Sequence, residues 1–183
     1  MAIPALVKAL RPKQWAKNVL VVAAPFAAGR LLEPSVAANV AVAFVAFCLA
    51  SSAVYLLNDV RDAPKDRLHP EKKNRPIASG QVAPSTAVVL AVVALVASLA
   101  LSTLAEPALL WVIVTYLVLQ LLYVFWLKNQ PVLDLAVIAS GFLLRALAGG
   151  AATDIAISDW FLLVAGFGSL FVVAGKRYSE LVT

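Results

Sequence analysis

The chain alternates long apolar runs with short polar segments. Five runs of 16 to 25 residues carry at most one charge, and they cover residues 35–57, 81–105, 107–127, 135–153 and 160–175. A helix needs roughly 20 apolar residues to cross the core of a bilayer. A shorter stretch, residues 15–32, carries Arg30 near its end and is predicted as the first crossing. The pattern therefore predicts six spans, and an all-α, polytopic transmembrane helix bundle that forms one domain over residues 1–183.

Composition supports an integral membrane protein. The chain is 62% hydrophobic with a mean hydropathy of +0.90, well above soluble domains. A cleaved signal peptide is the alternative reading of the basic N-terminal segment. The length of that segment, and Trp15 as an interfacial anchor, favour a retained first span. The single cysteine, Cys48, has no partner for a disulfide and is expected to be a core residue.

Basic residues predict the orientation of the chain. Thirteen of the fifteen Lys and Arg precede span one, lie between spans two and three or four and five, or follow span six. Arg30 lies in an opposite loop and Arg145 within a span. The positive-inside rule places both termini and residues 58–80 in the cytoplasm. The net charge of +5 then reflects orientation and contact with anionic lipid, and no nucleic-acid partner is predicted.

Residues 58–80, "NDVRDAPKDRLHPEKKNRPIASG", hold ten charged side chains in a chain that is 14% charged. Asn58, Asp62 and Asp66 are spaced i, i+4, i+8, and Asp59 joins the same stripe. If the second span continues as a helix past residue 57, their oxygens line one face at its cytoplasmic mouth. Pro64 could instead end that helix. Clustered carboxylates repel one another, so a cation is expected among them.

Oxygen ligands with room for water suit Mg²⁺, which binds through one or two carboxylates together with substrate phosphates. His69 is the only histidine, which argues against zinc. A basic arm of Lys72, Lys73 and Arg75 follows, and a carboxylate-held metal beside such an arm is suited to a diphosphate. The alternative is a solvated loop whose charges pair with each other. The helical spacing, and the position at the end of a span, favour the metal site.

The stretch resembles the first aspartate-rich motif of the UbiA superfamily of intramembrane prenyltransferases, NDxxDxxxDxxHxxKxxRPxxxG. Its fixed positions are occupied by Asn58, Asp59, Asp62, Asp66, His69, Lys72, Arg75, Pro76 and Gly80. "LRPKQWAKN" and "DLAVIASGFLLRALAGG" are also similar to the family, so the resemblance covers the whole chain. It implies a helical bundle around a central cavity, with Mg²⁺-bound diphosphate at the cytoplasmic mouth and a polyprenyl chain in a lipid-facing groove.

The chain departs from the family pattern in two ways. Family members generally have nine spans, whereas this sequence ends after the sixth, so we expect a longer parent protein with three further spans. Where a second aspartate-rich motif is expected, the chain has "GKRYSELVT". This segment resembles the branch that transfers 5-phosphoribose from phosphoribosyl diphosphate to a polyprenyl (decaprenyl) phosphate in cell-wall arabinan precursor synthesis.

The resemblance implies roles for individual residues. Asn58, Asp62 and Asp66 would hold Mg²⁺, with Asp59 as a further ligand or a supporting group, and these four form the predicted catalytic centre. The predicted substrate-binding residues are Lys17, Lys72, Lys73, Arg75, Tyr123, Asp134, Lys176, Arg177, Tyr178 and Glu180. Lys17, Lys176 and Arg177 are candidates for the 5-phosphate and the acceptor phosphate. Tyr178 and Glu180 would orient ribose hydroxyls, or form an ordinary helix end.

Three other polar positions have simpler expected roles. Lys128 is predicted to be an orientation charge rather than a ligand. Arg145 is expected to find a structural partner on another span. Four glycines are expected to allow close packing of spans: Gly149, Gly150, Gly166 and Gly168.

Two alternatives stay open. An Mg²⁺-dependent prenyltransferase would use the same first motif to move a polyprenyl group from its diphosphate to an aromatic or quinone precursor. A transporter or channel would also suit six spans, but no inverted repeat is visible. We predict a multi-pass protein of the bacterial plasma membrane whose active site faces the cytoplasm. Its oligomeric state stays open, with a homo-oligomer among the options.

Overall fold

The computed structural model describes residues 3–127 and 131–182, and every regular element in them is helical. In chain order the elements are α1 (Ile3–Ala9), η1 (Pro12–Val22), α2 (Ala23–Ala27), α3 (Pro34–Asp66), η2 (Lys72–Asn74), α4 (Pro84–Ser102), α5 (Pro107–Phe125), α6 (Pro131–Thr153) and α7 (Asp159–Val182). The predicted all-α bundle is confirmed. Four of the long helices start with proline, whose fixed φ and missing N–H suit the first turn.

Five helices are long and apolar enough to cross a membrane, α3 to α7. The predicted first span is not one regular helix, because its residues are divided between the 3₁₀ helix η1, the short helix α2 and a turn. A 3₁₀ helix rises about 2.0 Å per residue and an α-helix about 1.5 Å, so η1 and α2 together cover about 30 Å. That is the thickness of a bilayer core. The segment is therefore long enough to cross.

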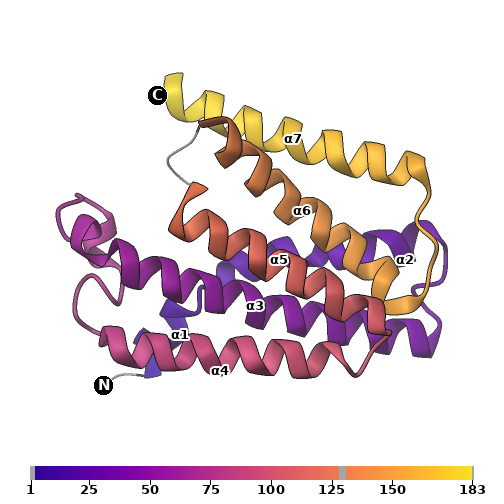
Figure 1. Cartoon of the computed structure of the whole chain (residues 1–183), viewed down its shortest axis with the longest axis horizontal. Coiled ribbons are helices and arrows are strands. Elements are labelled where there is room, and N and C mark those ends of the chain that lie inside the picture. Colours follow the sequence, from indigo (N-terminus) through magenta and orange to yellow (C-terminus); the bar gives the residue numbers. More distant parts are fainter. Residues whose placement is uncertain (1–2, 128–130, 183) are drawn as a thin grey trace.

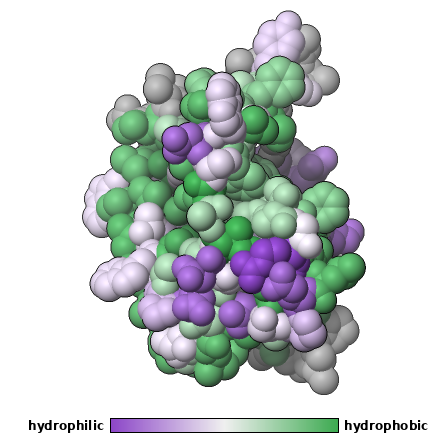
Figure 2. Space-filling view, turned by 90° about the vertical axis from the view of Figure 1, so that its right-hand side faces the viewer, coloured by the Kyte–Doolittle hydropathy of each residue, from purple (hydrophilic) through white to green (hydrophobic). Residues whose placement is uncertain are grey.

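Successive segments run in opposite directions through the bundle (Figure 1). Both termini lie at one end of it, together with the loop that joins α3 to α4. We call this the motif end, defined by α1, residues 67–83 and the last turns of α7. The opposite end carries the exposed ion pair of Arg30 with Glu33, at 2.9 Å. Figure 2 looks at that opposite end and shows a hydrophilic patch bordered by hydrophobic surface.

Helix α3 is the most buried of the membrane helices and lies at the centre of two apolar clusters. One cluster joins it to η1, α5 and α6, and includes Phe47 and Ile113. The other joins it to α1, α4 and residues 77–82, and includes Leu56 and Val82. Helix α7 lies at the edge and is the least buried. Helix α3 therefore lies between the two clusters, and its last turns bring the polar stretch to the motif end.

Close packing of α6 on η1 depends on Gly149. A Cβ added there would collide with the backbone carbonyl oxygen of Val21 and would lie 3.0 Å from Pro25 Cδ. Gly150 is also closely packed, with Ile157 2.7 Å from an added Cβ. The predicted close packing of spans is confirmed for Gly149, whereas Gly150 packs against the loop that follows α6. Around Gly166 and Gly168, an added Cβ would meet no described atom within 4 Å apart from the neighbouring backbone of its own helix, so the predicted close packing is not found at these two positions.

Candidate active site

The polar stretch begins as a direct continuation of α3. The helix passes Pro64 and ends at Asp66, so the predicted continuation past residue 57 is confirmed and the proline does not end it early. Pro64 has no N–H to donate to the Val60 carbonyl, and the helix ends two residues later. Asn58, Asp59, Asp62 and Asp66 therefore lie on one helix, as their spacing predicted.

A polar cavity of about 300 Å³ lies next to the start of this stretch, between η1, α3, α5 and α6. We call it the central cavity. Its lining residues are Arg11, Gln14, Lys17, Val54, Tyr55, Tyr116, Gln120, Tyr123, Ile138, Gly141, Phe142 and Arg145. Helix α3 contributes Val54 and Tyr55 to this lining. Asn58 comes one helical turn after these two residues, and Asp62 comes two turns after Tyr55. Asn58 and Asp62 therefore lie on the same face of α3 as the cavity-lining residues, nearer the motif end.

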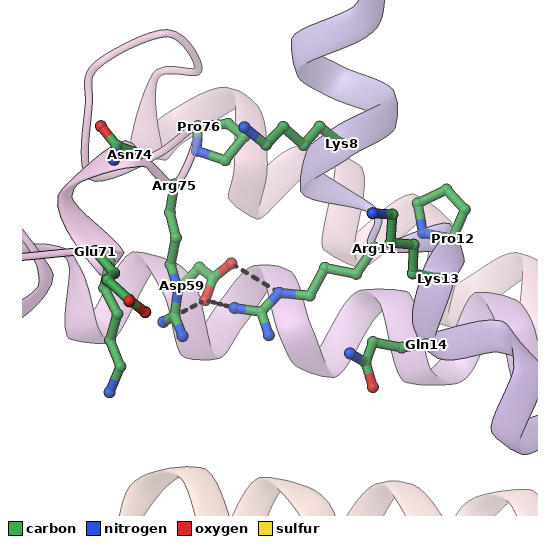
Figure 3. A pocket seen from close by; sticks show the side chains of 11 residues that line it. Lys8, Arg11, Pro12, Lys13, Gln14, Asp59, Glu71, Asn74, Arg75 and Pro76 are labelled. Carbon is green, nitrogen blue, oxygen red and sulfur yellow. Dashed lines mark hydrogen bonds and ion pairs between the residues drawn. The ribbon is translucent and has the colours of Figure 1, made fainter.

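Asp59 and Asp66 are held by arginines. Figure 3 shows the carboxylate of Asp59 between two guanidinium groups. The Nη2 of Arg11 lies 2.5 Å from Asp59 Oδ1, and the Nη1 of Arg75 lies 3.3 Å from the same oxygen. Arg75 also contacts Asp66 Oδ2 at 2.7 Å. Asp59 is only 2% exposed. Because two cations already neutralise it, Asp59 fits a supporting group better than a metal ligand.

Arg11 owes its position to a tightly held turn. It lies between α1 and η1 with a φ of 55°, in the left-handed region that non-glycine residues rarely adopt. The buried Ser52 hydroxyl holds both sides of the turn: it donates to the Leu10 carbonyl at 2.9 Å and accepts from the Trp15 indole at 3.0 Å. The guanidinium also lies over the Tyr55 ring, 4.9 Å from its centroid. Sequence reasoning treated Arg11 only as an orientation charge, and its partner lies 48 residues away.

The donor set fits a hard divalent cation. Within residues 3–127 and 131–182, no three His, Cys, Asp or Glu side chains converge on one point. Mg²⁺ does not require such a cage, since it keeps water and binds through one or two carboxylates plus substrate phosphates. Asn58 and Asp62 supply oxygens at the mouth of the central cavity, with Asp66 one turn further. The donor types of Asn58, Asp62 and Asp66 fit Mg²⁺, but Asp66 is paired with Arg75 in this structure and would have to exchange that partner for the metal.

The predicted basic arm divides in the structure. Lys72 and Lys73 lie exposed on η2, whereas Arg75 turns inward to the two aspartates. His69 Nδ1 accepts the backbone N–H groups of Glu71 and Lys72, at 3.2 and 3.4 Å. It thereby stabilises the loop.

A second polar group joins α5, α6 and α7 at the motif end. The Tyr123 hydroxyl, on the cavity wall, donates to Asp134 Oδ1 at 2.7 Å. Arg177 Nη2 lies 3.3 Å from Asp134 Oδ2, and Asp134 is 4% exposed. Three predicted site residues from three helices therefore meet at one place. Lys17 reaches the cavity from η1, with its ammonium 6.0 Å from the centroid of the Phe142 ring.

The remaining predicted site residues lie on α7. Tyr178 is 70% exposed and does not line the central cavity. The side chains of Lys176 and Glu180 lie outside the described part of the structure, and so does the whole of Lys128.

Arg145 closes the inner end of the central cavity. It donates to Asn18 Oδ1 at 2.7 Å, to the Gly141 carbonyl at 2.6 Å and to the Tyr116 hydroxyl at 3.1 Å. Its guanidinium also lies over the Phe47 and Tyr116 rings. The prediction of partners on another span is confirmed, and these partners are neutral. Tyr55, Tyr116 and Gln120 are cavity residues that the sequence did not reveal, because isolated polar residues in apolar spans show no spacing, and Gln14 in the basic segment was missed as well.

The comparisons agree with this architecture. The sequence profile of the UbiA prenyltransferase family matches residues 19–178. The chain is 54% identical over 183 residues to the decaprenyl-phosphate phosphoribosyltransferase of Mycolicibacterium smegmatis, covering 98% of this chain and 58% of the relative. It is 52% identical over 181 residues to the decaprenyl-phosphate phosphoribosyltransferase of Corynebacterium glutamicum, covering 97% and 54%. The chain thus spans little more than half the length of these curated relatives.

The fold has a counterpart among solved structures. A UbiA homolog from Archaeoglobus fulgidus, bound to DMAPP and Mg²⁺, superposes with a TM-score of 0.75 at 19% identity, covering 88% of this chain and 58% of that one. At this identity the likeness shows a shared fold.

Proposed function

This chain belongs to the UbiA prenyltransferase family, and we propose that its protein transfers 5-phosphoribose from phosphoribosyl diphosphate to a polyprenyl phosphate, with release of diphosphate. The observation that carries the proposal is the 54% identity, over nearly the whole chain, to a relative named for decaprenyl-phosphate phosphoribosyl transfer. The basic segment at Lys176 and Arg177 supports it, because a substrate that carries additional phosphate calls for additional positive charge.

In this proposal, the residues at the mouth of the central cavity have separate roles in binding metal and phosphate. Asn58, Asp62 and Asp66 would hold Mg²⁺, and the metal, when bound, would neutralise charge on the leaving diphosphate. Lys72 and Lys73 would neutralise further phosphate oxygens once the loop meets the substrate. Asp59 would act indirectly, by holding Arg11 and Arg75 at the place where the phosphates arrive.

The reaction requires no general base from the protein. The bond from ribose C1 to the diphosphate oxygen breaks with its electron pair on that oxygen, and C1 develops oxocarbenium character. An oxygen of the acceptor phosphate, already anionic, forms the new bond to C1. The residues around the cavity then have to bind charge and exclude water. Lys17, Lys176 and Arg177 would bind the 5-phosphate and the acceptor phosphate, and Tyr178 and Glu180 would orient ribose hydroxyls.

The proposal also implies how the site is oriented in the membrane. The protein would lie in the bacterial plasma membrane with the motif end in the cytoplasm, because the basic residues gather at that end. Soluble phosphoribosyl diphosphate would arrive from the cytoplasm. The lipid acceptor would enter laterally, and an apolar groove of about 450 Å³ between η1, α6 and α7 could receive its chain.

A transfer assay on the full-length protein tests the proposal. Ribose-labelled phosphoribosyl diphosphate is incubated with polyprenyl phosphate and Mg²⁺, and the lipid fraction is extracted. We expect label in the lipid, no label with Asp62→Ala, and unchanged transfer with Lys65→Ala, an exposed charge at the same end. Label that stays in the water phase would overturn the proposal.

Prenyl transfer to an aromatic acceptor is the second candidate, and the DMAPP and Mg²⁺ in the Archaeoglobus fulgidus structure favour it. It predicts that a prenylated aromatic product forms from a polyprenyl diphosphate while ribose stays unreacted. Transport would instead give flux of substrate without any covalent product. The same labelled membranes distinguish all three outcomes.

A further inference from the structure

A second, larger cavity lies at the motif end, outside the central cavity. It has a volume of about 750 Å³ and lies between the α1–η1 turn and residues 71–76, above α3. We call it the outer cavity. Its lining residues are Lys8, Arg11, Pro12, Lys13, Gln14, Asp59, Glu71, Lys72, Asn74, Arg75 and Pro76 (Figure 3). It shares only Arg11 and Gln14 with the central cavity.

Positive charge dominates the wall of the outer cavity. Five cationic side chains face two carboxylates, and one of those carboxylates, Asp59, is already bound by two guanidinium groups. Within the described residues, no ion pair joins Lys8, Lys13 or Lys72 to an acid. The excess of cations is therefore not balanced by the protein. An anion is the ligand that such a wall favours.

The proposed metal ligands do not belong to this wall. Asn58 and Asp62 are not among its lining residues, and Asp59 is occupied by Arg11 and Arg75. An anion in the outer cavity would therefore be bound by Lys and Arg without a metal. Guanidinium and ammonium groups are the side chains best suited to phosphate oxygens.

Part of the wall is held rigidly before any ligand arrives. Asp59 fixes both arginines, and the Ser52 hydroxyl holds the turn that carries Arg11. A receptor that is fixed in advance loses less conformational freedom on binding than a mobile charged loop does. This separates the outer cavity from the solvated lysines expected at any cytoplasmic membrane face.

We propose that the outer cavity is a second phosphate-binding site, which takes a phosphate ester without a metal ion. Its volume exceeds what a bare phosphate fills, which favours an ester with an attached group. The ester could come from the headgroup of an anionic lipid or from a soluble phosphate, because the cavity lies where polar loops meet membrane helices. Arg11, Lys72 and Arg75 also bind substrate phosphate in the proposed function, so the second site is tested through Lys8 and Lys13, which have no role in that function.

Two binding measurements on the full-length protein test this site in the presence of EDTA. Calorimetry with inorganic phosphate probes the soluble source. Native mass spectrometry from nanodiscs of phosphatidylglycerol, compared with phosphatidylcholine, probes the lipid source. The variants are Lys13→Gln and the double change Lys8→Gln with Lys13→Gln. Lys65→Gln is the matched control, since it removes an exposed charge at the same end outside the cavity. Both altered lysines are exposed, so the fold should survive, which circular dichroism checks.

We expect at least one probe to bind without metal. Each lysine change should weaken it about threefold, the effect of an exposed charge pair, and the double change by about the product. Lys65→Gln and Asp62→Ala should leave this binding unchanged. Phosphate binding supports a soluble ester, and selective retention of phosphatidylglycerol supports a headgroup. No binding of either probe, equal loss with Lys65→Gln, or binding that requires Mg²⁺ and is lost with Asp62→Ala would each overturn the proposal.

Discussion

Arg145 and Asn18 meet inside the bundle, 127 residues apart in sequence, through a 2.7 Å hydrogen bond from the arginine Nε to the asparagine Oδ1. Both side chains are buried, and the other described partners of this guanidinium are a carbonyl, a hydroxyl and two aromatic rings. A cation within a membrane helix is expensive unless neighbours or water solvate it. Neutral acceptors do so here, and the positive charge stays available to the central cavity.

Asn18→Ala should therefore destabilise the protein. The change leaves one N–H of a buried guanidinium without an acceptor, which costs about 1–3 kcal/mol. Denaturant unfolding of the full-length protein in detergent micelles measures it, with Val19→Ala as the exposed neighbour for comparison. Equal effects of the two changes would show that the Arg145 hydrogen bond does not contribute.

Ser52→Ala should cost more than Ser51→Ala, although the two serines are adjacent and equally buried. Among the described residues, the Ser51 hydroxyl bonds only to the Cys48 carbonyl in its own helix, whereas Ser52 holds Leu10 and Trp15 around the strained Arg11 turn. We expect a loss of about 1–3 kcal/mol for Ser52→Ala, from the orphaned carbonyl and indole groups.

Transfer activity should follow the same order. Release of the turn frees Arg11 from Asp59, so KM for the phosphate substrate should rise with Ser52→Ala and stay near its original value with Ser51→Ala. Steady-state kinetics measures this difference. A Ser51→Ala variant that is impaired as strongly would contradict the role of the turn.

Much of this fold was predictable because membrane helices depend on composition. The runs at 35–57 and 107–127 became α3 and α5, and the i, i+4, i+8 spacing correctly predicted that α3 continues to Asp66. The first span was only partly predicted. Its apolar residues indicate a crossing, but η1 is a 3₁₀ helix, and a choice between 3₁₀ and α geometry leaves little trace in hydrophobicity.

The site was less predictable, because contacts between distant segments decide it. Helical spacing placed Asp59, Asp62 and Asp66 on one helix, but it could not show that two arginines hold Asp59. One of them, Arg11, comes from a turn whose conformation depends on Ser52 in another helix. Tyr123 and Asp134 were each predicted singly, and only the structure joins them.

Gly149→Ala should destabilise the packing of α6 on η1. The new methyl group would collide with the Val21 carbonyl, a backbone atom that cannot turn away. Overpacking of this kind costs about 1–3 kcal/mol or more, beyond the roughly 1 kcal/mol that alanine gains over glycine in a helix. Gly166→Ala on α7 is the control, because an added Cβ there would meet no atom of the described residues within 4 Å, the neighbouring backbone of its own helix apart. Thermal unfolding should separate the pair, and similar midpoints would contradict the close approach.

Asp62 and Asp59 should differ in their effect on metal dependence. Asp62 lies on the stripe above the central cavity and is a proposed Mg²⁺ ligand, whereas Asp59 is bound by Arg11 and Arg75. Asp62→Asn should raise the Mg²⁺ concentration for half-maximal transfer by on the order of 10–100-fold or more, since even groups behind the ligands have effects of that size. Asp59→Asn removes the charge that holds the two arginines. It should raise KM for the phosphate substrate and leave the Mg²⁺ requirement unchanged.

Magnesium titrations of transfer activity distinguish the two roles of these aspartates. Glu33→Gln, in the exposed ion pair at the opposite end, controls for a general change of net charge. A second titration at saturating phosphate substrate should restore most of the rate of Asp59→Asn, because its defect lies in binding. The same excess should not rescue Asp62→Asn at low Mg²⁺. If Asp59→Asn shifts the Mg²⁺ requirement as far as Asp62→Asn does, Asp59 is a metal ligand, and its pairing with two arginines gives way when substrate binds.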